Sequence, residues 1–143
     1  MSKNVQKALE LFNGGFNCSQ SIIGTFCGQF GMNEELALKL TCGFAGGLRC
    51  GEVCGAVSSA AMIIGLRYGQ YVVNDKASKE KCYKITSDFM EEYQKRKGSV
   101  LCRELLGYDV RDTERRTLFP GRQKEVCPKV IETAVLLLEE MVF

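Results

Sequence analysis

The sequence contains no histidine, and this absence excludes several common kinds of functional site. Histidine is the usual proton shuttle near neutral pH and a very common metal ligand. Without it the chain cannot form a Ser-His or Cys-His catalytic pair, and the haem-attachment pattern CxxCH is also absent. Any metal site must therefore use other ligands.

Export signals and membrane-spanning segments are lacking as well. The first 17 residues contain neither the apolar core of a signal peptide nor a twin arginine. The longest apolar stretch, residues 53–66, is too short to span a bilayer and is interrupted by Ser58 and Ser59. We therefore expect a cytoplasmic protein that does not insert into a membrane.

Charge gives little indication of a polyanionic partner, because the net charge is only +2. Residues 95–124 carry nine Lys or Arg against four Asp or Glu. They lack the aromatic interleaving that is typical of a nucleic-acid surface. We expect this segment to be a solvated face and expect no nucleic-acid partner.

Hydrophobic spacing predicts an all-α fold, and the 143 residues are enough for one domain over residues 1–143. No stretch alternates as a half-buried strand would. Residues 108–123 are polar and are expected to form a loop, whereas Cys127-Pro128 is expected to open the last helix with Cys127 as its N-cap. The expected architecture is a single compact bundle of about five or six helices, at residues 3–12, 18–30, 34–41, 52–68, 76–97 and 128–143.

A glycine-rich and cysteine-rich segment, residues 42–69, organises the chain. Its first part is a loop, and Gly51 and Gly55 are expected to bring the backbone close to a cofactor. A tight connection between packed helices is the alternative explanation. The second part predicts a central, closely packed helix whose buried face carries small residues and one larger one: Ala56, Ser59, Ala60 and Ile63.

Eight cysteines are the most unusual feature of the composition. In a reducing cytosol, clustered cysteines favour metal binding or redox chemistry over a disulfide framework. Four of them fall at expected helix N-termini, where the helix dipole should lower the thiol pKa: Cys18, Cys54, Cys102 and Cys127. If these ends converge, they form a pocket for an anionic cluster, a metal–tetrathiolate or a reactive thiol pair. The alternative is that each is a small buried apolar residue.

The other four cysteines show no such placement. Cys27 lies on an apolar helix stripe and is expected in the core, while Cys82 is expected to have no role. Cys42 and Cys50 flank the glycine-rich loop and could join a site. The spacing from Cys50 to Cys54 is not CxxC, and no familiar zinc or ferredoxin pattern occurs.

The segments NCSQS (17–21), CGFAGG (42–47), GEVCGAVSSA (51–60) and CRELLG (102–107), with the late Cys127, resemble the bacterial redox-active family C_GCAxxG_C_C, named for its cysteines. The resemblance implies that Cys18, Cys54, Cys102 and Cys127 are its four signature cysteines. The chain departs from the family name by reading Cys54-Gly55-Ala56 and by having Ser59 where the motif ends in glycine.

We therefore expect a cysteine-based redox protein in which the four cysteines bind an iron–sulfur cluster. Such a protein would carry electrons or serve an oxidoreductase, so we expect an oxidoreductase or an electron-transfer protein as its partner, and a homo-oligomer is left open. Two alternatives remain: a thiol–disulfide protein that uses two of the four cysteines, and a helical binding module stabilised by a four-cysteine zinc site. In each case Cys54 is expected to be the most consequential cysteine.

Overall fold

The computed structural model describes residues 2–143, which form eight α-helices and no sheet. The all-α expectation is confirmed, but the expected number of five or six helices is too low. The helices are α1 (Lys3–Asn13), α2 (Cys18–Phe26), α3 (Glu34–Thr41), α4 (Gly55–Tyr68), α5 (Lys76–Lys97), α6 (Cys102–Leu106), α7 (Thr113–Leu118) and α8 (Arg122–Met141). Shorter turns connect them at η1 (Cys27–Phe30), η2 (Cys42–Phe44) and η3 (Gly47–Gly51).

The expected loop over residues 108–123 is wrong, because this segment contains α7 and the start of α8. The Asp112 side chain accepts a hydrogen bond from the backbone N–H of Arg115 at 3.0 Å and caps α7. No residue of α7 is buried, so this helix has no apolar stripe that the sequence could reveal. Gly121, at φ 78°, then separates α7 from α8.

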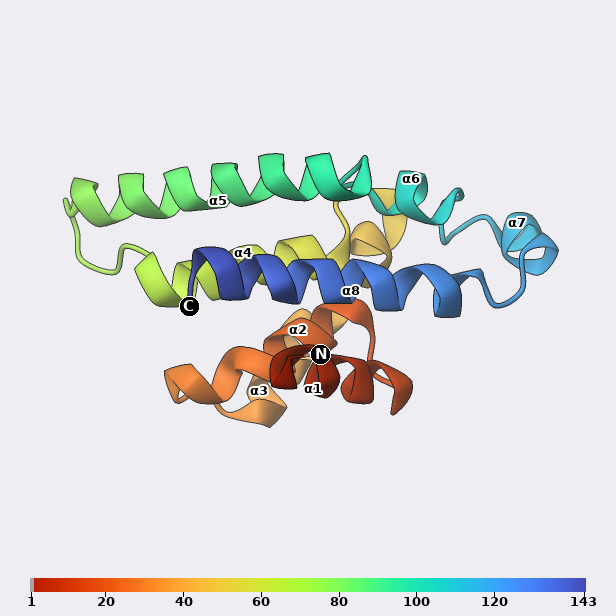
Figure 1. Ribbon diagram of the computed structural model, residues 1–143, viewed down its shortest axis with the longest axis horizontal. Coiled ribbons are helices and arrows are strands. Elements are labelled where there is room, and N and C mark those ends of the chain that lie inside the picture. The colour runs from red at the N-terminus through yellow and green to blue at the C-terminus, as the bar shows by residue number, and fades with distance from the viewer. Residues whose placement is uncertain (1) are drawn as a thin grey trace.

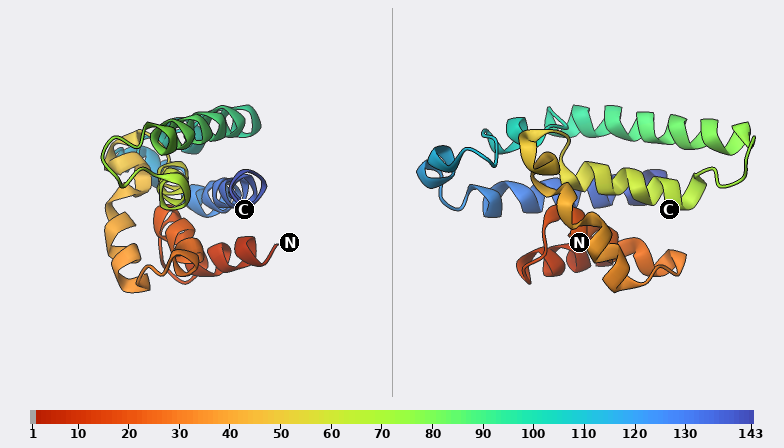
Figure 2. Two further views of the ribbon diagram at one scale, coloured as in Figure 1. Left: turned by 90° about the vertical axis from the view of Figure 1, so that its left-hand side faces the viewer. Right: turned by 180° about the vertical axis from the view of Figure 1, so that it is seen from behind.

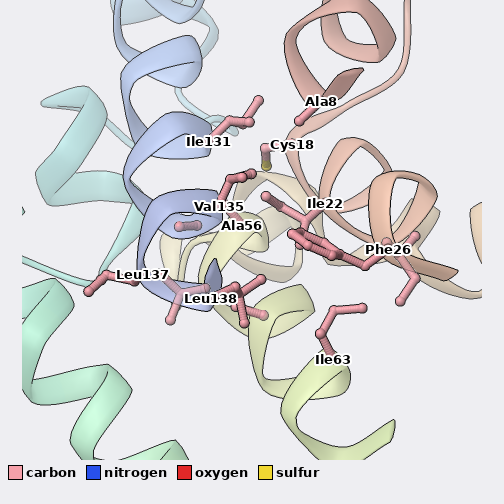
Figure 3. Packing of buried hydrophobic residues seen from close by; sticks show 14 of the residues in the cluster. Ala8, Cys18, Ile22, Phe26, Ala56, Ile63, Ile131, Val135, Leu137 and Leu138 are labelled. Carbon is pink, nitrogen blue, oxygen red and sulfur yellow. The ribbon is translucent and has the colours of Figure 1, made fainter. Parts of the chain in front are cut away.

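The helices lie in three layers (Figures 1 and 2). The middle layer contains α4 and α8, with α5 on one side and α1, α2 and α3 on the other. The α4 helix packs against α2, α5 and α8, which confirms its expected central position. Figure 3 shows Ala56 and Ile63 of α4 in one cluster with Ile22 of α2 and Leu138 of α8.

Small side chains allow this close packing of α4. Ala56, Ser59, Ala60 and Ile63 are all fully buried, as expected.

Within residues 2–143, no helix combines the length and the apolar character needed to cross a membrane.

Candidate functional site

Four cysteines line one cavity of about 100 Å³ between the helices: Cys18, Cys54, Cys102 and Cys127. They come from the start of α2, the residue before α4, the start of α6 and the second turn of α8. Most of the other lining residues are apolar: Phe12, Ala45, Leu105, Leu106, Val110, Val126 and Val130. The expected gathering of these cysteines around one pocket is therefore confirmed. Their roles as ligands or reactive thiols stay predictions.

Cys18 is positioned by the polar residues around it in the NCSQS segment. Asn17 and Gln20 form a reciprocal cap at the start of α2, with bonds of 3.0 and 3.1 Å between side chain and backbone. The Asn17 amide also donates to the Cys42 carbonyl at 3.0 Å, and the Gln20 amide donates to the Leu38 carbonyl at 3.1 Å. These bonds fix the first turn of α2 against the end of α3, with Cys18 directed into the core (Figure 3).

Ser59, which replaces the glycine of the family motif, is accommodated by a hydrogen bond. Its hydroxyl donates to the Ser19 carbonyl at 2.8 Å, so this buried polar group is satisfied. The Ser19 hydroxyl in turn donates to the Thr41 carbonyl at 2.7 Å. The contact between α4 and α2 is therefore specified by a polar bond one residue away from Cys18.

A short antiparallel bridge, centred on Val53 and Leu101, holds two of the cysteines beside each other. The backbone N–H of Cys54 donates across the bridge at 2.8 Å, and that of Cys102 donates back at 2.7 Å. These two bonds align the start of α4 with the start of α6. A bridge of one residue pair is too short to produce a strand pattern in the sequence.

The expectation that Cys127 caps the last helix is wrong. The α8 helix begins at Arg122, so Cys127 lies in its second turn, with Pro128 inside the helix. Arg122 fixes this early start, because its Nε donates to the Leu106 carbonyl at 2.9 Å. Cys127 consequently reaches the cavity from the side of a helix and not from its N-terminus.

The two glycines that were expected to approach a cofactor have different surroundings. Gly55 does not line the cavity itself but packs against two residues that do, since a Cβ there would stand 2.8 Å from Cys18 Sγ and 3.0 Å from Ala45 Cα. Gly51 does not line the cavity. It has φ 73°, and a Cβ there would stand 3.1 Å from the Cβ of Arg103, so Gly51 serves the tight connection to α6.

The thiols of Cys18 and Cys54 form a hydrogen-bonded pair with opposite pKa shifts. The hydrogen bond from Cys54 lowers the pKa of Cys18 in spite of its burial, and backbone N–H groups of Ser19, Gly46 and Ala56 act in the same direction. The same hydrogen bond, together with burial, raises the pKa of Cys54 well above its ordinary value. Cys18 is thus the more acidic thiol of the pair, and Cys54 the less acidic one.

The remaining two thiols also favour the neutral form. Burial, reinforced by the electrostatic interaction with Cys18, raises the pKa of Cys102 to about 11, although the nearby Arg49 opposes this shift. Burial likewise raises the pKa of Cys127 to about 12. The expectation of four lowered thiol pKa values therefore holds only for Cys18. The hydrogen bond to Cys18 is the main cause at Cys54, burial is the main cause at Cys102 and Cys127, and Cys127 also lies away from a helix N-terminus.

Cysteines outside the cavity behave largely as expected. Cys27 is buried in the hydrophobic core, and Cys82 packs partly buried on α5. Cys42 is exposed, and the Cys50 thiol points to the Gly47 carbonyl at 3.3 Å, so neither lines the cavity.

Arg49 lines the cavity and was not expected there. The sequence signal that could have revealed it is that Arg49 is the single charged residue of the glycine-rich loop, residues 42–51.

All eight cysteines are free thiols. Among residues 2–143, no three Cys, His, Asp or Glu side chains are grouped so that they could hold a metal ion. The four thiols therefore surround a space and do not converge on one point.

No curated protein and no solved structure was found to be similar to this chain. A family model described as "Putative redox-active protein (C_GCAxxG_C_C)" matches residues 16–141, which includes all four cysteines of the cavity. The match confirms the resemblance seen in the sequence motifs, and the chain belongs to this family of cysteine-containing redox-active proteins.

Proposed function

We propose that this chain is an electron-transfer protein whose four cavity cysteines bind an iron–sulfur cluster. The observation that supports this proposal is the arrival of four thiols, from four separate segments, at one largely apolar cavity. Four cysteines are the usual ligand set of such clusters, and a chain without histidine cannot supply a Rieske-type site. Membership of a redox-active family is consistent with this role.

The chemistry of the donor set fits this cofactor. A tetrahedral zinc site needs four ligands around one point, and no three such side chains are grouped in that way among residues 2–143. Backbone N–H groups of Ser19, Gly46 and Ala56 interact with the Cys18 sulfur, and such bonds tune the potential of sulfur-ligated iron. A bound cluster would accept and donate single electrons. The apolar walls would exclude water, and an oxidoreductase would be the partner.

Thiol–disulfide exchange is a second candidate, and the hydrogen-bonded pair of Cys18 and Cys54 favours it. The Cys18 thiolate would attack a disulfide of a partner protein and form a mixed disulfide, releasing one partner thiolate. Cys54 would then lose its proton and attack Cys18, which releases the second partner thiolate. The pair would lose two electrons and end as a disulfide, and the partner would gain both electrons as two thiols.

Anaerobic purification separates these functions. Wild-type protein should be brown and contain iron and sulfide after incubation with ferrous iron and sulfide under reducing conditions. Cys54→Ser replaces a thiolate ligand with a poorly ionised hydroxyl, so bound iron and visible absorbance should fall sharply. Cys82→Ser is the control, because Cys82 is a partly buried thiol that lies outside the cavity.

Three results would point elsewhere. A colourless wild-type protein in which oxidation joins Cys18 to Cys54 would replace the cluster with thiol–disulfide exchange. Bound zinc whose loss in Cys54→Ser lowers the melting temperature would indicate a structural zinc site. Cys54→Ser and Cys82→Ser behaving alike in metal content, thiol oxidation and melting would refute a functional role for the cavity.

A further inference from the structure

Residues 46–49 form a short left-handed turn beside the cysteine cavity. Gly46 and Gly47 have φ values of 69° and 63°, and the non-glycine residues Leu48 and Arg49 follow with 57° and 59°. A side chain with a Cβ is disfavoured in this region, and two in succession require a surrounding structure that holds them there.

Contacts with the following residues hold the turn in place. The backbone N–H of Glu52 donates to the Gly47 carbonyl at 3.1 Å, and a Cβ on Gly47 would collide with the Glu52 backbone. Arg103, from α6, donates to the Gly51 carbonyl at 3.0 Å. The left-handed conformation is therefore built into the packing of the loop against α6.

The consequence of the turn is the position of Arg49. Its side chain folds back over Gly46, where an added Cβ would lie 2.7 Å from the Arg49 Nη1. The N–H of this same Gly46 interacts with the Cys18 sulfur. Arg49, Gly46 and Cys18 thus line the same cavity, and the Arg49 charge opposes the rise in the pKa of Cys102 on that cavity.

Arg49 also differs from the neighbouring arginines in its pairing. Arg103 pairs with Glu52 at 3.1 Å, and Arg111 pairs with Asp109 at 2.7 Å. Within residues 2–143, no carboxylate lies within 4 Å of the Arg49 guanidinium. Arg49 is solvent-exposed, so its positive charge is solvated by water and is not paired with a carboxylate of the described residues.

We propose that Arg49 is the charge-balancing residue of the cysteine centre and that the left-handed turn exists to hold its guanidinium at the cavity. This inference rests on the proposed redox function and names a residue that sets its potential. Reduction adds negative charge to a sulfur-ligated centre, and a fixed cation beside the centre favours that state. The same cation stabilises a thiolate if the centre is a thiol pair.

Two matched glycine variants test the proposal. Arg49→Gly and Leu48→Gly each remove one non-glycine residue from the left-handed region, so both should keep or raise the urea midpoint of unfolding. Only Arg49→Gly removes the charge. Its reduction potential should become more negative than that of wild type, while that of Leu48→Gly should not change. Arg49→Lys, which keeps the charge, should recover most of the shift.

Equal potentials in Arg49→Gly and Leu48→Gly would overturn the inference and leave the redox function standing. If the wild type holds a thiol pair instead of a cluster, the readout is the reduction potential of the Cys18–Cys54 disulfide in glutathione buffers. Arg49→Gly should again make this potential more negative, while Leu48→Gly should leave it unchanged. If Arg49→Gly does not fold, the reduction potentials of Arg49→Gln, which removes the charge, and Arg49→Lys, which keeps it, give the same comparison. A wild type with neither centre refutes the redox function and this inference together.

Discussion

Replacement of Gly55 by alanine tests the packing that brings α4 to the cysteine cavity. The new methyl group would stand 2.8 Å from Cys18 Sγ, 3.0 Å from Ala45 Cα and 3.1 Å from the Phe44 carbonyl oxygen. Carbon atoms prefer separations of roughly 3.5–4.0 Å, so all three contacts are too short. Two of the three are with backbone, which cannot rotate away as a flexible side chain would.

The expected loss follows from two opposing effects. Overpacking of a filled site costs roughly 1–3 kcal/mol. Alanine is favoured over glycine within a helix by up to about 1 kcal/mol, although Gly55 is the first residue of α4 and gains less. We therefore expect Gly55→Ala to be about 1–2 kcal/mol less stable than wild type, with the start of α4 displaced from Cys18.

Gly65→Ala in the same helix is the matched control, because no atom lies within 4 Å of the Cβ that would be added there. This variant should be neutral or up to about 1 kcal/mol more stable, since it gains helix propensity without a clash. The two variants should thus differ by about 1 M in the urea midpoint, for a denaturant slope of about 2 kcal/mol/M. Equal midpoints, with cofactor loading unchanged in Gly55→Ala, would refute the close approach of α4 to Cys18.

Further predictions concern the core, the cap and the buried thiols. Ala60→Leu should overpack the buried face of α4 and lower the free energy of unfolding by roughly 1–3 kcal/mol, measured by thermal or urea melts. Asn17→Ala removes the N-cap of α2 and should lower the free energy of unfolding by roughly 0.5–2 kcal/mol. Asn33→Ala removes the N-cap of α3, outside the cavity, and serves as the comparison variant. In the metal-free protein, the free energy of unfolding should fall as pH rises from about 9 to 12. The unfolded chain loses the protons of Cys102 and Cys127 near the ordinary thiol pKa of 9.0. The folded chain keeps these protons until about pH 11 and about pH 12, so the unfolded state is favoured over this range. Urea unfolding at several pH values checks this slope, and a flat profile would contradict the burial of these thiols.

Local sequence signals predicted those helices that have both an apolar stripe and a clear cap. The α5 helix runs from Lys76 to Lys97 as expected, because Asp75 caps its start and Gly98, at φ 82°, ends it. The α7 helix could not be found in this way, since none of its residues is buried. Its cap at Asp112 was present in the sequence but had no periodic segment beside it.

The candidate site was predictable only as far as local rules apply. Helix placement selected Cys18, Cys54, Cys102 and Cys127, and the cavity contains all four, although Cys127 was selected on the wrong expectation that it caps the last helix. The thiol pKa values were not predictable, because burial depends on which segments pack around each sulfur. Cys54 illustrates this: a hydrogen bond to Cys18 and removal from water reverse the shift that its place before a helix would give.

Arg49 was missed for a different reason, and that reason supports its functional importance. Neither Leu48 nor Arg49 belongs to a residue type that favours positive φ, yet both adopt it. Tertiary packing therefore overrides local preference over two successive residues, which lowers stability and is retained only where something else depends on it. The feature that depends on it, in our proposal, is the Arg49 guanidinium, which lies against Gly46 and lines the same cavity as Cys18. A loop of the same length in relaxed conformations would direct this cation elsewhere and leave the anionic centre without its counter-charge.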